Sequence, residues 1–128
     1  MVNFLAPAQL RINVVHLDGS AQLLLDGELD LLTAPDLWRS ASEVVARLPS
    51  RSELVIDLSQ LDFLDAAGLG VLVRLRNHLR SKGSALHLDA APSRVRRVFE
   101  LTELDGLLRR PREDRSGAAS SEEMEMQA

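Results

Sequence analysis

Cysteine and tyrosine are absent from this 128-residue sequence, and its aromatic residues are one tryptophan and three phenylalanines. The absence of cysteine excludes a thiol nucleophile, thiolate metal ligands and redox sensing through a disulfide. No apolar run approaches the roughly 20 residues of a membrane-spanning helix. The first ten residues also lack the basic and apolar regions of a secretory signal. We therefore expect a cytoplasmic protein that does not associate with membranes.

Acidic residues outnumber basic ones by 19 to 15, and the formal net charge is −4. The excess is concentrated in residues 111–128, which hold two basic and five acidic side chains. With no basic excess and few aromatic rings, the sequence lacks the surface that nucleic-acid binding requires. Residues 111–128 also show no hydrophobic period, which predicts a disordered acidic tail after a domain spanning residues 1–110.

Hydrophobic patterning predicts four strands, three helices and a terminal helical segment. The expected strands lie at residues 11–17, 21–29, 53–58 and 85–90. The expected helices lie at residues 34–48, 66–82 and 93–101, and a last helical turn lies at 104–108. This order, ββαβαβα plus a terminal helix, requires crossover connections between strands. We expect a single α/β domain with a four-stranded, mostly parallel sheet flanked by helices.

Three local features of this pattern are specific enough to test. Thr33 precedes Ala-Pro-Asp and is a candidate N-cap for the first helix. The third strand, ELVIDL, is almost continuously apolar, which is typical of a strand covered on both faces. Ser59 follows it and is expected in a turn.

The start of the second helix is the most unusual part of the sequence. Asp65 is a candidate N-cap, Ala66 and Ala67 take the first two helical positions, and Gly68 follows. A helix N-terminus carries unpaired amide groups and partial positive charge, so a serine here would be a favourable phosphorylation site. The alanines offer no hydroxyl. This segment is either an ordinary capped helix or a docking end that stays neutral.

A second line of side chains runs along the same helix. Leu69, Val73, Arg76 and Arg80 share one face, apart from the apolar stripe expected to pack on the sheet. If exposed, this face offers two apolar side chains and two guanidinium groups to a protein with an acidic groove. Alternatively, Leu69 and Val73 pack under a neighbouring helix and the arginines are solvated.

Three segments, taken together and in this order, resemble the STAS domain family, specifically the stand-alone bacterial anti-sigma factor antagonists (anti-anti-sigma factors). They are LDGELDLLTAPDL (24–37), LVIDLSQLDFLDAAGLGVLVRL (54–75) and GSALHLDAAPSRVRRVFELTELDGLL (83–108). The resemblance implies a role in partner switching. In that role the antagonist binds an anti-sigma factor, often a serine kinase that itself binds ATP, and so releases a sigma factor for transcription.

The family pattern at the helix start is Asp-Ser-Ser/Thr-Gly, and phosphorylation of the second hydroxyl residue breaks the complex. The corresponding stretch here is Asp65-Ala66-Ala67-Gly68, so the resemblance places the phosphoacceptor at Ala67, which cannot be phosphorylated. Four explanations stay open. The chain is a permanently competent antagonist, a decoy or scaffold regulated elsewhere, or an accessory subunit of another complex such as a lipid-transport ATPase. In the fourth, the alanines are introduced rather than native.

The predicted partner-binding surface combines the helix start and its outer face with the loop that follows the second strand. It comprises Asp65, Ala66, Ala67, Gly68, Leu69, Val73, Arg76, Asp26, Gly27, Asp30 and Thr33. Of these, Leu69 and Val73 are expected to supply apolar contact and Arg76 to supply charge. The three histidines have no ligand or catalytic spacing. We therefore expect no enzymatic activity, no metal and no cofactor; the sequence leaves the oligomeric state undetermined.

Overall fold

The computed structural model describes residues 9–109, and the predicted tail at 111–128 lies outside them. Two strands, β1 (Leu10–Leu17) and β2 (Ser20–Leu29), are followed by helix α1 (Ala34–Arg47). Strand β3 (Glu53–Leu64), helix α2 (Ala66–Ser81) and strand β4 (Ala85–Asp89) come next. Helix α3 (Ser93–Leu101) and a short 3-10 helix, η2 (Asp105–Leu107), complete the described chain. The predicted order of elements is confirmed.

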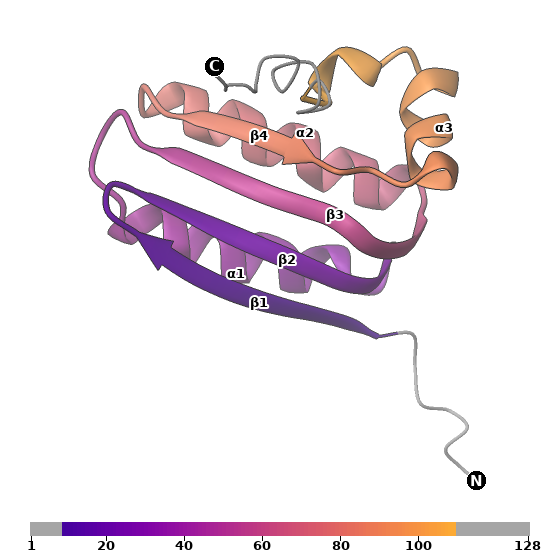
Figure 1. Ribbon diagram of the computed structural model, residues 1–128, viewed down its shortest axis with the longest axis horizontal. Coiled ribbons are helices and arrows are strands. Elements are labelled where there is room, and N and C mark those ends of the chain that lie inside the picture. Colours follow the sequence, from indigo (N-terminus) through magenta and orange to yellow (C-terminus); the bar gives the residue numbers. More distant parts are fainter. Residues whose placement is uncertain (1–8, 110–128) are drawn as a thin grey trace, which may run out of the picture.

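The four strands form one sheet in the order β1-β2-β3-β4. Strands β1 and β2 are antiparallel and joined by a tight turn, whereas β2, β3 and β4 run parallel to one another. Helices α1 and α2 lie side by side on one face of the sheet, and α3 lies beyond its β4 side (Figure 1). The single α/β domain with a mostly parallel sheet is therefore confirmed, with one antiparallel pair at its edge.

The core lies between the sheet and helices α1 and α2. Alternate residues of β2 and β3, such as Leu23, Leu25 and Ile56, are fully buried in one apolar cluster with residues of α1 and α2, such as Leu37 and Leu72. This alternation follows from the two-residue period of a strand, which directs every second side chain to the same face.

The opposite face of the sheet is less well covered than the sequence predicts. Val55 and Asp57 of β3 are half-buried, so β3 is fully enclosed on its helix side only. The prediction of a strand covered on both faces is therefore wrong. An apolar side chain at position 55 is compatible with a partly open face, because a single half-exposed valine is common on protein surfaces.

Strand β3 also extends six residues past its predicted end at Leu58. Pairing with β2 continues through Asp26–Gln60 and Glu28–Phe63, with two register irregularities that accommodate the extra residues. Ser59 therefore lies within β3 rather than in a turn, and its amide donates to the Asp57 side chain over 2.8 Å. At the other end of the fold, the predicted terminal helix is reduced to the three residues of η2.

Candidate partner-binding surface

The candidate surface lies where β2 and β3 end and α2 begins. Because β2 and β3 are parallel, their carboxyl ends meet at the same edge of the sheet, and Leu29 pairs with Leu64 there. The Asp65 amide then donates to the Leu29 carbonyl over 3.3 Å. The loop after β2 and the amino end of α2 are thereby held together, as the sequence predicts for Asp30, Thr33 and Asp65.

Asp65 is the N-cap of α2, as predicted. Its backbone is extended, and Oδ1 accepts a hydrogen bond from the Gly68 amide over 2.9 Å. Its second oxygen, Oδ2, accepts from the Leu31 amide over 3.2 Å. One carboxylate therefore caps the helix and also ties the β2–α1 loop to it.

Gly68 allows α2 to approach the end of β2 closely. A Cβ atom at this position would lie 2.4 Å from the Leu29 carbonyl oxygen and 2.8 Å from Leu64 Cδ1. Neither distance is compatible with normal packing, and the first involves backbone. Gly68 is itself buried, so its contribution to the surface is to position the helix end rather than to contact a partner.

The β2–α1 loop is organised around Asp30 and Thr33. Asp30 Oδ1 accepts from the amides of Leu32 and Thr33, each over 3.0 Å. The Thr33 hydroxyl donates to the Glu28 carbonyl over 2.8 Å and accepts from the Asp30 amide over 3.0 Å. Thr33 occupies the N-cap position of α1, but its side chain makes no capping hydrogen bond to that helix. The hydroxyl points back into the loop, because the turn offers it both a donor and an acceptor.

This loop exposes apolar residues that the sequence pattern does not single out. Leu31 is 70% exposed and Leu32 is 71% exposed, and the Leu31 amide contacts Asp65. Phe63 at the end of β3 is 47% exposed, and Ala66 is also exposed. Two leucines just before a helix are equally typical of a core contact, so their exposure is visible only in the folded chain.

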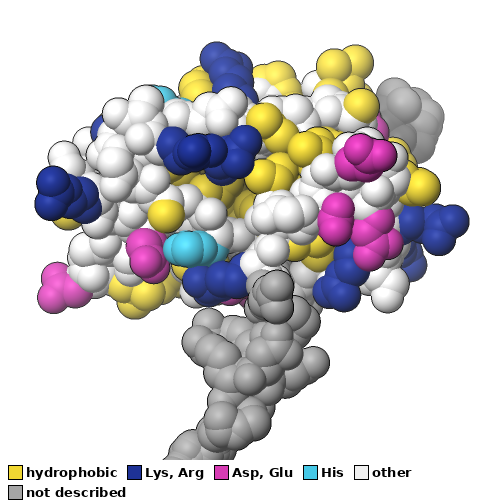
Figure 2. All heavy atoms as spheres, turned by 90° about the horizontal axis from the view of Figure 1, so that it is seen from above, with side chains coloured by type: hydrophobic (Ala, Val, Ile, Leu, Met, Phe, Trp, Pro, Cys, Tyr) yellow, Lys and Arg dark blue, Asp and Glu magenta, His cyan; other side chains and the backbone are white. Residues whose placement is uncertain are grey.

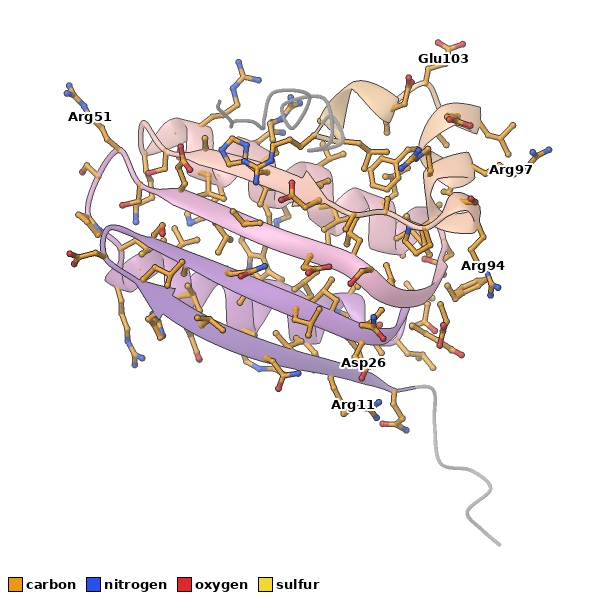
Figure 3. All side chains as sticks on the ribbon, in the orientation of Figure 1. Arg11, Asp26, Arg51, Arg94, Arg97 and Glu103 are labelled. Carbon is orange, nitrogen blue, oxygen red and sulfur yellow. The ribbon has the colours of Figure 1, made fainter. Side chains whose placement is uncertain are left out.

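Helix α3 adds a positive charge beside these residues. Arg94 Nη1 donates to the Asp62 carbonyl over 3.4 Å, which places the guanidinium near the end of β3 (Figure 3). Arg94 and the nearby Arg97 are exposed. The helix start is thus bordered by exposed apolar side chains and by arginine.

The predicted outer face of α2 is only partly available. Leu69 is 5% exposed and belongs to the core, so the prediction that it supplies surface contact is wrong. Val73 and Arg76 are half-buried, and Arg76 Nε donates to Asn77 Oδ1 over 3.2 Å. The reason is that α2 packs against α1 on one side and β4 on the other, which covers part of both flanks.

Asp26 and Gly27 make close contacts on the β1 side of β2. Asp26 Oδ2 lies 2.9 Å from Arg11 Nη2, and the two side chains point toward each other across β1 and β2 (Figure 3). Gly27 has a φ of 124°, and a Cβ there would lie 2.2 Å from the Gln9 carbonyl oxygen. The predicted proximity of these two residues to Asp65 is therefore not supported by a direct contact.

Replacement of Asp65 by alanine should destabilise the domain while leaving it folded. The variant loses the α2 cap and the Leu31 contact, and we expect the free energy of unfolding to fall by about 1–2 kcal/mol. Urea unfolding followed by circular dichroism measures this loss. Glu43→Ala is the control, because Glu43 is an exposed residue in the middle of α1 and its removal should change stability by less than about 0.5 kcal/mol. Equal losses in the two variants would contradict the assigned role of Asp65.

The described residues hold no group of three histidine, aspartate or glutamate side chains arranged to bind a metal ion. Between residues 9 and 109, no helix is both long and apolar enough to cross a bilayer.

Comparison with known proteins agrees with this geometry. The family described as "Mlab, STAS domain" matches residues 12–109. The anti-sigma-F factor antagonist RsfB of Mycobacterium tuberculosis is 36% identical over 104 residues, which are 81% of this chain and 83% of the relative. The anti-sigma-B factor antagonist of Listeria monocytogenes is 34% identical over 93 residues, or 73% of this chain and 76% of the relative. Both are named for regulation rather than catalysis, in agreement with the prediction of a non-enzymatic protein.

Solved structures show the same architecture. An anti-sigma factor antagonist from Mycobacterium paratuberculosis superposes with a TM-score of 0.68 at 33% identity, covering 78% of this chain and 83% of that one. The unphosphorylated form of the antagonist SpoIIAA shares the fold, with a TM-score of 0.67 at 16% identity over 87% of this chain and 98% of that one. With its sheet order, its capped α2 and a family match over most of its length, this chain belongs to the STAS domain family.

Proposed function

We propose that this chain is a cytoplasmic anti-sigma factor antagonist, which binds an anti-sigma factor and thereby releases a sigma factor. The observation that carries the proposal is its similarity to two curated relatives with antagonist names, over most of the length of each. The partner is inferred to be of the serine kinase type, with ATP bound by the partner and not by this chain.

The contact surface in this proposal is the amino end of α2 together with the loop beside it. Leu31, Leu32 and Phe63 supply the apolar centre, and Ala66 and Ala67 supply a flat, uncharged helix start. Arg94 and half-buried Arg76 supply charge at the rim. An apolar centre with a charged border is typical of protein–protein interfaces. Burying two leucines that are about 70% exposed would contribute roughly 2–4 kcal/mol to binding.

Regulation in this proposal does not use phosphorylation at the helix start. Ala67 is the second residue of α2 and has no oxygen to accept a phosphoryl group. The helix end therefore gains no phosphoryl charge and keeps the partial positive charge of a helix N-terminus. The chain stays competent to bind. The amount of protein in the cell, rather than its modification at this position, would then set how much anti-sigma factor is occupied.

Replacement of Leu32 by serine tests the apolar centre of the surface. We expect affinity for the anti-sigma factor to fall about tenfold or more, because most of this side chain is exposed and becomes buried on binding. Leu101→Ser is the matched control, since Leu101 is also 71% exposed but lies at the far end of α3. Isothermal titration with the anti-sigma factor isolated by affinity capture from the native cell measures both. Equal affinities for the two variants would contradict this surface.

The captured partner also tests the function itself. An anti-sigma factor identified by mass spectrometry is the expected result. Recovery of a transporter ATPase instead would contradict the proposal and favour the accessory-subunit alternative.

A further inference from the structure

The two edge strands of the sheet differ in whether another segment of the chain covers them. At the β4 edge, Leu108 bridges to Leu88 and the Arg109 amide donates to the Leu88 carbonyl over 2.9 Å. Half-buried apolar residues of α3 and η2 also pack against the core here, and hydrophobic side chains gather at the centre of this face (Figure 2). At the other edge, no segment among residues 9–109 pairs with the outer side of β1 (Figure 1).

The register of β1 against β2 determines which backbone amides and carbonyls of β1 face away from the sheet. The Glu28 amide donates to the Gln9 carbonyl over 2.9 Å, and the register then runs unbroken from Leu10–Gly27 to Leu17–Ser20. Hydrogen-bonded and non-bonded pairs alternate in an antiparallel ladder, so every second residue directs its amide and carbonyl away from β2. The outward residues of β1 are Leu10, Ile12, Val14 and His16.

This edge lacks the features that usually prevent association. Natural edge strands are commonly protected by lysine, proline, a bulge or short length. Strand β1 has eight residues, LRINVVHL, with no proline, no lysine and no register break. Three of its six exposed side chains are apolar: Val14 is 39% exposed, Val15 is 49% exposed and Leu17 is 56% exposed. Its one arginine, Arg11, is engaged by Asp26.

We propose that β1 pairs with β1 of a second copy of this chain, antiparallel about a two-fold axis at Asn13, to form a continuous eight-stranded sheet. A second copy fits because β1 is self-complementary in this register. Leu10 faces the partner's His16 and Ile12 faces the partner's Val14, so all four outward residues of each strand meet outward residues. The apolar pair Ile12–Val14 occurs twice, and no like charges lie opposite each other.

The extent of this contact limits its strength. A strand of eight residues is about 27 Å long, and an interface confined to it buries less than the roughly 1,200 Å² of a stable complex. The dimer is therefore reversible and forms at high protein concentration. The inference does not depend on the proposed function, because β1 contributes no residue to the partner-binding surface around Leu32.

Sedimentation velocity of the full chain, from micromolar to millimolar concentration, tests the association. We expect the wild type to shift from monomer to dimer with concentration. Val14→Lys should raise the dissociation constant about tenfold or more, because it places an edge charge against Ile12 of the partner subunit at two symmetric positions. Leu32→Lys is the control and should dimerise like the wild type. A wild type that sediments as a monomer throughout the range overturns the proposal.

Single cysteines test the register, since the natural sequence contains none. Asn13→Cys places the two sulfurs at the two-fold axis, in a non-bonded pair whose Cα atoms lie about 4.5 Å apart, which suits a disulfide. Val15→Cys lies on the same face but opposite Arg11, too far from its own copy to form the bond. We expect oxidised dimer from the Asn13→Cys variant and little from the Val15→Cys variant. Equal cross-linking of the two would overturn the register.

Discussion

Replacement of Ala67 by aspartate is expected to weaken binding of the anti-sigma factor by about 100-fold or more, which corresponds to roughly 2.7 kcal/mol. The substitution introduces a carboxylate at the half-buried second position of α2, where the proposed contact would desolvate it without a partner. Folding should be little affected, because a negative charge in the first turn of a helix is favourable. Titration calorimetry measures the affinity, and thermal unfolding measures the stability.

Two variants separate the effect of charge at this position from other causes. Asn77→Asp adds the same charge to an exposed position of α2 about 15 Å further along the helix, and binding should stay within about twofold of wild type. Ala67→Ser should bind like the wild type until a serine kinase and ATP are added, after which the complex should dissociate. If the Ala67→Asp variant bound with the affinity of the wild type, the start of α2 would not be part of the interface.

Replacement of Gly68 by alanine is expected to reduce the free energy of unfolding by about 2 kcal/mol or more. The new Cβ would lie 2.4 Å from the Leu29 carbonyl oxygen, so α2 must shift away from the end of β2. Overpacking of this kind typically destabilises by about 1–3 kcal/mol, and contact with backbone places Gly68 at the upper end of that range. Urea unfolding of the variant measures the loss.

Gly70→Ala, on the same helix, is expected to change the free energy of unfolding in the opposite direction. Position 70 is exposed, and a Cβ there would have no neighbour within 4 Å. Alanine should therefore stabilise the domain by about 0.5–1 kcal/mol through helix propensity alone. If the two variants changed stability equally, the close approach of α2 to β2 would not be what requires glycine at position 68.

The order and type of the elements could be predicted because their signals are local. The turn at Asp18-Gly19, the helical spacing of α2 and the cap at Asp65 each depend on neighbouring residues. The length of β3 could not be predicted in this way. Polar Ser59 and Gln60 interrupt its apolar pattern, yet pairing with β2 continues past them through register shifts. Such pairing depends on a strand that lies some 30 residues earlier in the chain.

The structure brings together some of the residues predicted for the candidate surface and separates or buries others. Asp65, Asp30 and Thr33 are brought together, because the ends of parallel strands share one edge of the sheet. The spacing of Leu69 and Val73 defines a line on α2, but periodicity does not reveal whether another element covers that line. Leu69 is covered, whereas Leu31 and Leu32 are left exposed by a turn that directs its polar groups inward.

Site-specific photo-cross-linking in the native cell tests most directly whether the neutral start of α2 is a docking surface. A photoreactive residue at Leu32 is predicted to capture an anti-sigma factor identified by mass spectrometry, and the same residue at Leu101 should capture far less of it. The Ala67→Asp background should abolish capture at Leu32. Cross-linking of a transporter ATPase at Leu32, or of an anti-sigma factor equally from both positions, would contradict the account.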